Sequence, residues 1–256
     1  MRSLTFGFTP CPNDAFAFHA LVHGLVEAPF VVEPVLLDIE ELNQRARTGE
    51  LDLTKLSFGA APAARERYRL LRSGAALGHG VGPLVVAREV SEGYERIAVP
   101  GRDTTAFLLL RLAWPEHGEV VEMRYDEILD AVASGAVDAG LIIHESRFTY
   151  AEHGLVKVVD LGEWWEAETG LPVPLAGIYA REGVPTDEVE RSIRASVEYA
   201  FAHPEASREY VREHSHELSE DVCRAHIELY VNEFSVDLGE PGLAAIERLA
   251  SASLAA

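Results

Sequence analysis

His144 directly follows the apolar run Leu141-Ile142-Ile143, which is typical of a buried strand that ends in a polar loop. An imidazole titrates near neutral pH, and partial burial can shift its pKa to a value suited to a general base. Strand alternation would turn the next residue, Glu145, to the opposite face, so Glu145 is a poor candidate to orient the ring. From the residues alone, His144 is either a catalytic base or a structural histidine with satisfied hydrogen bonds.

A candidate anion site lies in Pro100-Gly101-Arg102-Asp103-Thr104-Thr105, where a Pro-Gly turn joins a predicted strand to a predicted helix. Thr104 and Thr105 would stand at the helix start. Free N–H groups, the helix dipole and two hydroxyls can together bind an anion there. Threonine is also a frequent N-cap without any ligand, so both interpretations stay open.

Two further loops place polar side chains after predicted strands. In Lys55-Leu56-Ser57, Ser57 can cap the next helix and face the same cleft, whereas a lysine at the surface is the simpler alternative. In Thr9-Pro10-Cys11-Pro12-Asn13-Asp14, two prolines stiffen a helix entrance. Asn13 and Asp14 either cap this helix or hold a ligand hydroxyl.

The elements that must position these loops alternate between short β runs and helical patterns, which is typical of an α/β fold. The predicted strands lie at residues 4–8, 51–56, 70–73 and 84–87 in a first series, at 96–99, 120–124 and 139–143 in a second, and later at 156–161 and 175–180.

Two such series predict two α/β lobes. A polar break at residues 88–93 and a second crossover near 172–180 indicate that residues 1–88 and 178–256 form one lobe and that residues 89–177 form the other. Ligands would then bind in the cleft between the lobes, at the C-terminal ends of the strands.

The charge balance argues against two classes of partner. With 22 Lys and Arg against 42 Asp and Glu, the net charge of −20 repels nucleic-acid phosphates and anionic membrane surfaces, so neither nucleic acid nor a membrane is expected. The chain is 48% hydrophobic and 25% charged, as in ordinary globular proteins.

The sequence also predicts a cytoplasmic protein without a metal or cofactor. No apolar run is long enough to span a bilayer, and two prolines interrupt the N-terminal segment before a signal peptide can develop. Cys11 and Cys223 lack paired spacing, so we expect free thiols. His19 and His23 have the i, i+4 spacing of metal ligands, but no His-Glu-x-x-His motif or nucleotide-binding glycine motif is present.

Several longer stretches carry a specific resemblance. They are Gly7-Phe8-Thr9-Pro10-Cys11-Pro12-Asn13-Asp14, Leu53-Thr54-Lys55-Leu56-Ser57, Gly80-Val81-Gly82-Pro83-Leu84-Val85-Val86, Val99-Pro100-Gly101-Arg102-Asp103-Thr104-Thr105-Ala106, Gly140-Leu141-Ile142-Ile143-His144-Glu145-Ser146-Arg147-Phe148-Thr149-Tyr150 and Tyr230-Val231-Asn232-Glu233-Phe234-Ser235. These stretches are spread along nearly the whole chain. Together they resemble the 1,4-dihydroxy-6-naphthoate synthase family of the futalosine route to menaquinone.

The resemblance implies the two-lobed fold of type II periplasmic binding proteins, used here by a lyase. Its carboxylated substrate would be cyclic dehypoxanthine futalosine, cleaved to 1,4-dihydroxy-6-naphthoate with loss of a small sugar-derived fragment. The resemblance also implies that His144 is the proton acceptor and that Lys55 to Ser57 and Thr105-Ala106 contact the substrate. Base-initiated carbon–carbon cleavage and aromatisation needs no cofactor when fixed donors meet the developing charge.

Two alternatives remain at this point. One is the chorismate dehydratase of the same pathway, which shares the fold, and turnover of chorismate would decide for it. The other is a non-enzymatic solute-binding protein, against which the missing signal peptide argues. The sequence does not define an oligomeric state.

Overall fold

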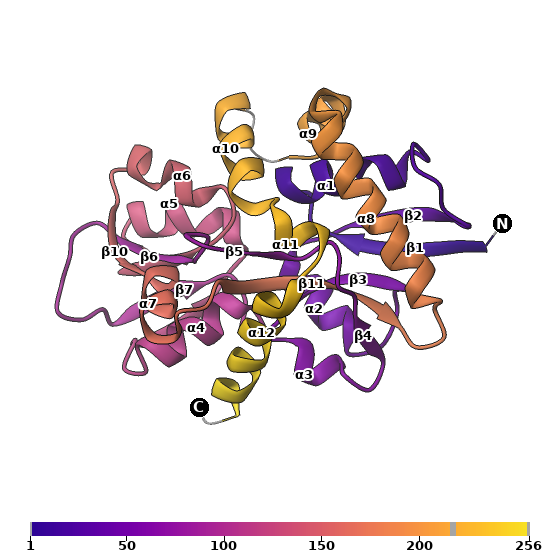
Figure 1. Cartoon of the computed structure of the whole chain (residues 1–256). Coiled ribbons are helices and arrows are strands. Elements are labelled where there is room, and N and C mark those ends of the chain that lie inside the picture. The colour runs from indigo at the N-terminus through magenta and orange to yellow at the C-terminus, as the bar shows by residue number, and fades with distance from the viewer. Residues whose placement is uncertain (1, 216–218, 255–256) are drawn as a thin grey trace.

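The computed structural model describes residues 2–215 and 219–254, which form two sheets flanked by helices (Figure 1). The first sheet has the strand order β2 (Phe30–Leu36), β1 (Arg2–Phe8), β3 (Leu53–Ser57), β11 (Val173–Arg181) and β4 (Tyr68–Leu70), and β5 (Ala76–Gly78) also pairs with β11. The second has the order β10 (Val156–Asp160), β6 (Leu84–Ala87), β9 (Ala139–Ile142), β7 (Arg96–Val99) and β8 (Glu119–Glu122). We call each sheet with its helices the first and the second lobe.

In each sheet, three neighbouring strands at one side run parallel. Strand β1 runs parallel to β2 and β3, and β7 runs parallel to β8 and β9. Antiparallel strands complete the sheets: β11 beside β3, and β6 beside β9. Because parallel strands share one direction, the loops that follow them gather at one edge of each sheet.

The helices are distributed between the lobes. The first lobe holds α1 (Pro12–Val22), α2 (Ile39–Ala46), α3 (Ala61–Ala64), α8 (Thr186–Ala202), η3 (Pro204–Ser207), α9 (Arg208–His214), α10 (Glu220–Tyr230) and α11 (Glu233–Val236). The second holds α4 (Thr105–Ala113), η1 (Tyr125–Glu127), α5 (Ile128–Ala133), α6 (Ser146–Thr149), η2 (Tyr150–His153) and α7 (Leu161–Thr169). Helix α12 (Gly239–Ser253) packs against both β11 and α4, and so ties the two lobes together (Figure 1). Over the two described ranges, no helix is both long and apolar enough to cross a membrane.

Apolar packing also continues from one lobe to the other. One cluster of buried side chains includes Leu56 and Tyr179 of the first sheet together with Val85 and Leu141 of the second. In the first lobe, the rings of Phe6, Phe8 and Phe18 pack with centroids 5.0 to 5.3 Å apart, which joins α1 to β1. The lobes therefore share a core on one side of the cleft.

The sequence did not predict β2. Its Pro34 argues against a strand, because proline cannot donate a ladder hydrogen bond. The sheet tolerates it because β2 is an edge strand that pairs with β1 alone among the described strands. An edge strand can leave the missing N–H on its open side.

The predicted lobe borders are wrong for β6. We expected residues 1–88 in the first lobe, but residues 84–87 pair with β9 and β10 in the second sheet. Strand β11 likewise belongs to the first sheet from Val173 onward, before the expected border at 177/178. The polar break at residues 88–93 is an exposed loop inside the second lobe, between β6 and β7, because polar composition marks the surface and not a lobe border. The division of residues 1–88 and 178–256 from 89–177 as separate bodies stays a prediction.

Gly82 lies between β5 and β6, where the chain first passes from the first lobe to the second. A substitution there tests what fixes the position of this segment. A Cβ on Gly82 would lie 2.2 Å from the backbone of Gly162, at the start of α7, so no side chain fits between them. We expect Gly82→Ala to lower the free energy of unfolding by about 1–3 kcal/mol, as overpacking does. Urea unfolding measures this loss.

Gly93→Ala is the matched control for that measurement. Gly93 is exposed, and its Cβ would meet no atom within 4 Å. We expect the free energy of unfolding of the Gly93→Ala variant to stay within about 1 kcal/mol of that of the wild type. Equal effects of the two substitutions would show that the contact does not fix the crossing.

Candidate active site

A cavity of about 70 Å³ lies where the loops that follow the parallel strands of the two sheets meet. Its walls combine residues from both lobes. They are Asn13, Ile39, Lys55, Ser57, Ala76, Val81, Pro83, Thr104, Thr105, Ala106, Ile143, His144, Leu175, Ala176, His226 and Tyr230. The four loops singled out in the sequence therefore contribute side chains to one site.

His144 is held in an unusual backbone conformation. Its φ is 56°, and it is the one non-glycine residue with positive φ in the part of the chain that the structure describes. Strand β9 ends two residues earlier, so a left-handed turn and not the strand itself carries the imidazole. Such strained residues are frequent at functional sites, where the surrounding structure enforces them.

The ring of His144 is buried and uncharged. Its Nε2 is buried and has no hydrogen-bond partner among the described residues. Burial, together with the positive charge of Lys55, lowers the pKa of His144 to about 3. The imidazole is therefore neutral at pH 7.

Glu145 follows the end of β9, so the argument from strand alternation does not apply to it. It begins the turn into α6 and is not part of the strand. The hydroxyl of Tyr125 donates to Glu145 Oε1 at 3.4 Å, and Glu145 Oε2 lies 3.7 Å from Nδ1 of His226. The ring of Tyr125 also meets the ring of His144 edge-on, with centroids 4.8 Å apart.

His226, on α10, is a second buried histidine in the cavity wall that the sequence did not single out. Its ring lies nearly parallel to that of His144, with centroids 6.4 Å apart. Burial, followed by the effects of His144 and Lys55, lowers the pKa of His226 well below its usual value. Glu145, on the second lobe, is the acidic group that faces it.

Lys55 brings a positive charge into the cavity wall. Lys55 and Asp14 are only 3% and 2% exposed, and Nζ of Lys55 forms an ion pair with Oδ1 of Asp14. The other oxygen of Asp14 accepts from the N–H and the hydroxyl of Thr9, at 3.1 and 2.7 Å. Asn13 donates to Asp14 Oδ1 at 3.0 Å. The Thr9–Asp14 loop is thus the frame that holds the lysine in place.

The start of α4 presents backbone donors to the cavity. Thr104 is the N-cap, as predicted, since its hydroxyl accepts from the N–H of Phe107 at 3.1 Å. Thr105 and Ala106 are the first two residues of the helix, where N–H groups have no intrahelical acceptor. The hydroxyl of Thr105 accepts from Gly59 N–H at 3.0 Å and donates to the carbonyl of Leu175 at 2.6 Å. In this conformation its side chain joins the lobes.

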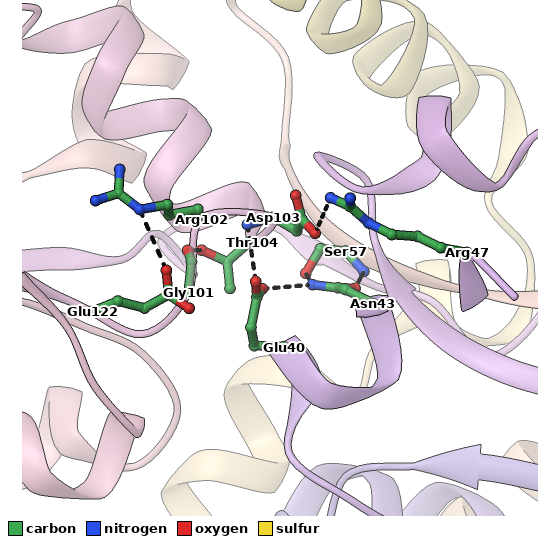
Figure 2. Close-up of polar contacts among 9 residues, drawn as sticks. All are labelled: Glu40, Asn43, Arg47, Ser57, Gly101, Arg102, Asp103, Thr104 and Glu122. Carbon is green, nitrogen blue, oxygen red and sulfur yellow. Dashed lines mark hydrogen bonds and ion pairs between the residues drawn. The ribbon is translucent and has the colours of Figure 1, made fainter. Parts of the chain in front are cut away.

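Ser57 ends β3 and does not cap the next helix through its side chain. Its N–H donates to Asn43 Oδ1 at 2.9 Å, and its Oγ accepts from Asn43 Nδ2 at 3.1 Å. Figure 2 shows this pair beside Glu40, which accepts a hydrogen bond from the same Asn43 amide at 3.3 Å.

Two of the predicted substrate-binding side chains do not reach the cavity. Leu56 is fully buried in the apolar cluster because strand alternation turns it away from its neighbours Lys55 and Ser57. Asp14 lies behind Lys55 and contacts it directly. Neither Asn13 nor Asp14 caps α1, whose N-cap is Cys11. Substrate contact by the remaining predicted residues stays a prediction.

The described residues contain no group of three or more His, Cys, Asp and Glu side chains arranged to hold a metal ion. His19 and His23 stack on each other, with ring centroids 4.4 Å apart. Within the described residues, neither Cys11 nor Cys223 is part of a disulfide.

Comparison with known proteins identifies relatives along the whole chain. A family model described as menaquinone biosynthesis matches residues 4–253. A 1,4-dihydroxy-6-naphthoate synthase from Thermus thermophilus is 56% identical over 254 residues, which cover 97% of this chain and 93% of the relative.

Solved structures show the same architecture. A protein from Archaeoglobus fulgidus matches with a TM-score of 0.94 at 39% identity, over 99% of this chain and 97% of that one. A Candida albicans protein with the generic periplasmic binding protein fold matches with a TM-score of 0.71 at 12% identity, over 99% and 91% of the two chains. The predicted two-lobed fold of this class is confirmed.

The buried pair of Lys55 and Asp14 yields a stability prediction. Asp14→Asn leaves the lysine charge buried without a counter-charge, so we expect the free energy of unfolding to fall by about 3–5 kcal/mol. In a Lys55→Met background the same substitution should cost about 1 kcal/mol or less, because no buried charge then remains. Denaturant unfolding of the four proteins checks this.

Glu163→Gln is the control for the ion-pair experiment, because the pair of Glu163 and Lys157 is exposed. We expect a change within about 0.5 kcal/mol. If Asp14→Asn cost the same in both backgrounds, its contribution would come from the Thr9 hydrogen bonds and not from the lysine.

Proposed function

Because this chain belongs to the menaquinone biosynthesis family, we propose that it is a 1,4-dihydroxy-6-naphthoate synthase. It converts cyclic dehypoxanthine futalosine to 1,4-dihydroxy-6-naphthoate by base-initiated carbon–carbon cleavage and aromatisation. The enzyme is a lyase that acts on a small molecule. The same proposal places it in the cytoplasm, where biosynthetic intermediates of this kind are made.

The state of His144 is the observation that carries the proposal. Its Nε2 is buried at the cavity without a partner among the described residues, and its lowered pKa keeps it neutral. A neutral imidazole can remove the substrate proton that starts the cleavage. The left-handed turn at His144 fixes the direction of this base.

The substrate carboxylate or its neighbouring oxygens would lie between the lobes. The residues that would bind it line the cavity: Thr105 and Ala106 with the N–H groups at the start of α4, Ser57 with its hydroxyl, and Lys55 with its ammonium. Such fixed donors also stabilise negative charge that develops on oxygen during the reaction. They act at short range against a net protein charge of −20.

Turnover is the direct test of the proposal. We expect purified protein to convert cyclic dehypoxanthine futalosine to the naphthoate, detected by mass spectrometry, and to leave chorismate unchanged. Dehydration of chorismate in place of this reaction would instead identify the sister dehydratase, and binding without turnover would identify a solute-binding protein.

His144→Gln should separate a catalytic base from a structural histidine. We expect kcat to fall by about 10²- to 10⁴-fold while the thermal unfolding temperature stays close to that of the wild type. The control is His203→Gln, because His203 is exposed at the end of α8. A folded His144→Gln variant within about threefold of wild-type kcat would end the assignment.

The pH profile follows from the direction of the His144 pKa shift. A base works only when unprotonated, and a pKa lowered to about 3 keeps it so throughout the range from pH 5 to 8. We therefore expect kcat/KM to lack an acid limb near pH 6.5. A limb at that pH, absent from the unfolding curve of the same protein, would show that the base titrates like an exposed histidine.

A further inference from the structure

The amide of Asn43 is held in one orientation by three hydrogen bonds. Its Oδ1 accepts from the N–H of Ser57 at 2.9 Å. Its Nδ2 donates to Ser57 Oγ at 3.1 Å and to Glu40 Oε2 at 3.3 Å. A flipped amide would place its NH₂ group against the N–H of Ser57 and its oxygen against the carboxylate of Glu40, so only this orientation satisfies all three groups.

This orientation decides which way the Ser57 hydroxyl donates. Because Ser57 Oγ already accepts a hydrogen bond from Asn43, its own O–H must point elsewhere. No acceptor for this O–H appears in the hydrogen bonds of the described residues, and Ser57 lines the cavity. Ser57 therefore offers a hydroxyl donor to an oxygen of the ligand.

Glu40 connects this pair to the opposite lobe. While its Oε2 accepts from Asn43, its Oε1 accepts from the N–H of Asp103 at 3.3 Å (Figure 2). Glu40 and Asn43 lie on α2 of the first lobe, whereas Asp103 lies in the loop before α4 of the second. Close by, Arg47, which directly follows α2, forms an ion pair with the carboxylate of Asp103.

The approach of the two lobes at this point depends on Gly101. A Cβ on Gly101 would lie 2.4 to 2.5 Å from the carboxyl end of Glu40, and its φ of 143° also disfavours other residues. Glu40 is buried, so its carboxylate depends on these protein donors and not on water. That burial, with the nearby charge of Asp103, raises the pKa of Glu40.

We propose that Asn43 and Glu40 are positioning residues for the reaction. Asn43 directs the hydroxyl proton of Ser57 into the cavity. Glu40 holds the Asn43 amide, and its second hydrogen bond, from the N–H of Asp103, forms only when the second lobe has closed onto α2. The inference rests on the proposed function, because it assigns Ser57 to the binding of an oxygen of that substrate. Neither residue touches the substrate itself.

The test is a double-mutant cycle between Asn43→Asp and Ser57→Ala. A carboxylate at position 43 cannot donate to Ser57, so the hydroxyl turns away from the cavity to donate to it. We expect kcat/KM to fall by about 10- to 100-fold when Ser57 is present. In the Ser57→Ala background, Asn43→Asp should change kcat/KM by no more than about threefold, because the proton that it misdirects is already gone.

Gln44→Glu is the matched control for this cycle. It makes the same amide-to-carboxylate change one residue further along α2, at an exposed position. We expect wild-type kcat/KM. If Asn43→Asp folds poorly, as judged by thermal unfolding, Asn43→Ala replaces it in the same cycle, since it removes the donor without adding a charge.

The contact with the second lobe has its own measurement. Small-angle X-ray scattering with and without 1,4-dihydroxy-6-naphthoate reports the compaction of the chain on ligand binding. We expect Glu40→Ala to compact less than the wild type at saturating naphthoate and to lose kcat/KM by about 10-fold or more. Full compaction of this variant would overturn the part of the proposal that concerns Glu40.

The outcomes separate the two proposals. A wild-type protein that does not turn over cyclic dehypoxanthine futalosine rejects the proposed function. An active wild type in which Asn43→Asp loses the same factor with and without Ser57 rejects the positioning role alone, because the loss then comes from the fold of α2.

Discussion

The polar groups of this site lie between the two lobes, where they are removed from water. The need of each such group for a hydrogen-bond partner is the constraint on which the site depends. A buried donor or acceptor that lacks a partner costs free energy, so most such groups in this cleft are paired. Lys55 has Asp14, and Ser57 has Asn43. Among the described residues, Nε2 of His144, Oδ1 of Asn13 and Nδ1 of His226 are buried polar atoms of the cavity wall without hydrogen-bond partners. A fold tolerates such atoms where a ligand supplies the missing partner.

The same constraint explains how a strongly acidic protein can hold a carboxylate. The net charge of −20 is spread over the surface, where solvent and salt screen it. In the proposed complex, the ammonium of Lys55, the start of α4 and the Ser57 hydroxyl would act on the substrate over hydrogen-bond distances. The short-range term dominates there, because attraction between fixed groups grows as the local dielectric constant falls.

The sequence predicted the loops of the site better than the partners of each residue. Strand ends are readable because apolar runs stop abruptly, and this located His144, Ser57 and Thr105. Partners depend on packing between distant segments, which no local pattern encodes; His226 reaches the cavity only because α10 packs beside it. One signal was available for Asn43, since it shares the face of α2 with Ile39 and Ala46, and an asparagine on an apolar face needs a buried partner. For Leu56, the expected substrate contact came from treating Lys55 to Ser57 as one unit. Strand alternation turns the middle side chain of the three away from the cavity.

In this conformation the cavity is smaller than the pockets that hold small molecules in other proteins. Pockets that hold small molecules measure roughly 300–1,000 Å³, whereas this one measures about 70 Å³. The contacts that close it are polar: Thr105 with Gly59 and Leu175, and Glu40 and Arg47 with Asp103.

If the lobes open, water can replace each of these polar contacts. A substrate that binds the N–H groups of α4 and the hydroxyl of Ser57 at once contacts both lobes. The binding free energy of such a substrate favours the closed state. The polar contacts between the lobes then determine only the final geometry of closure.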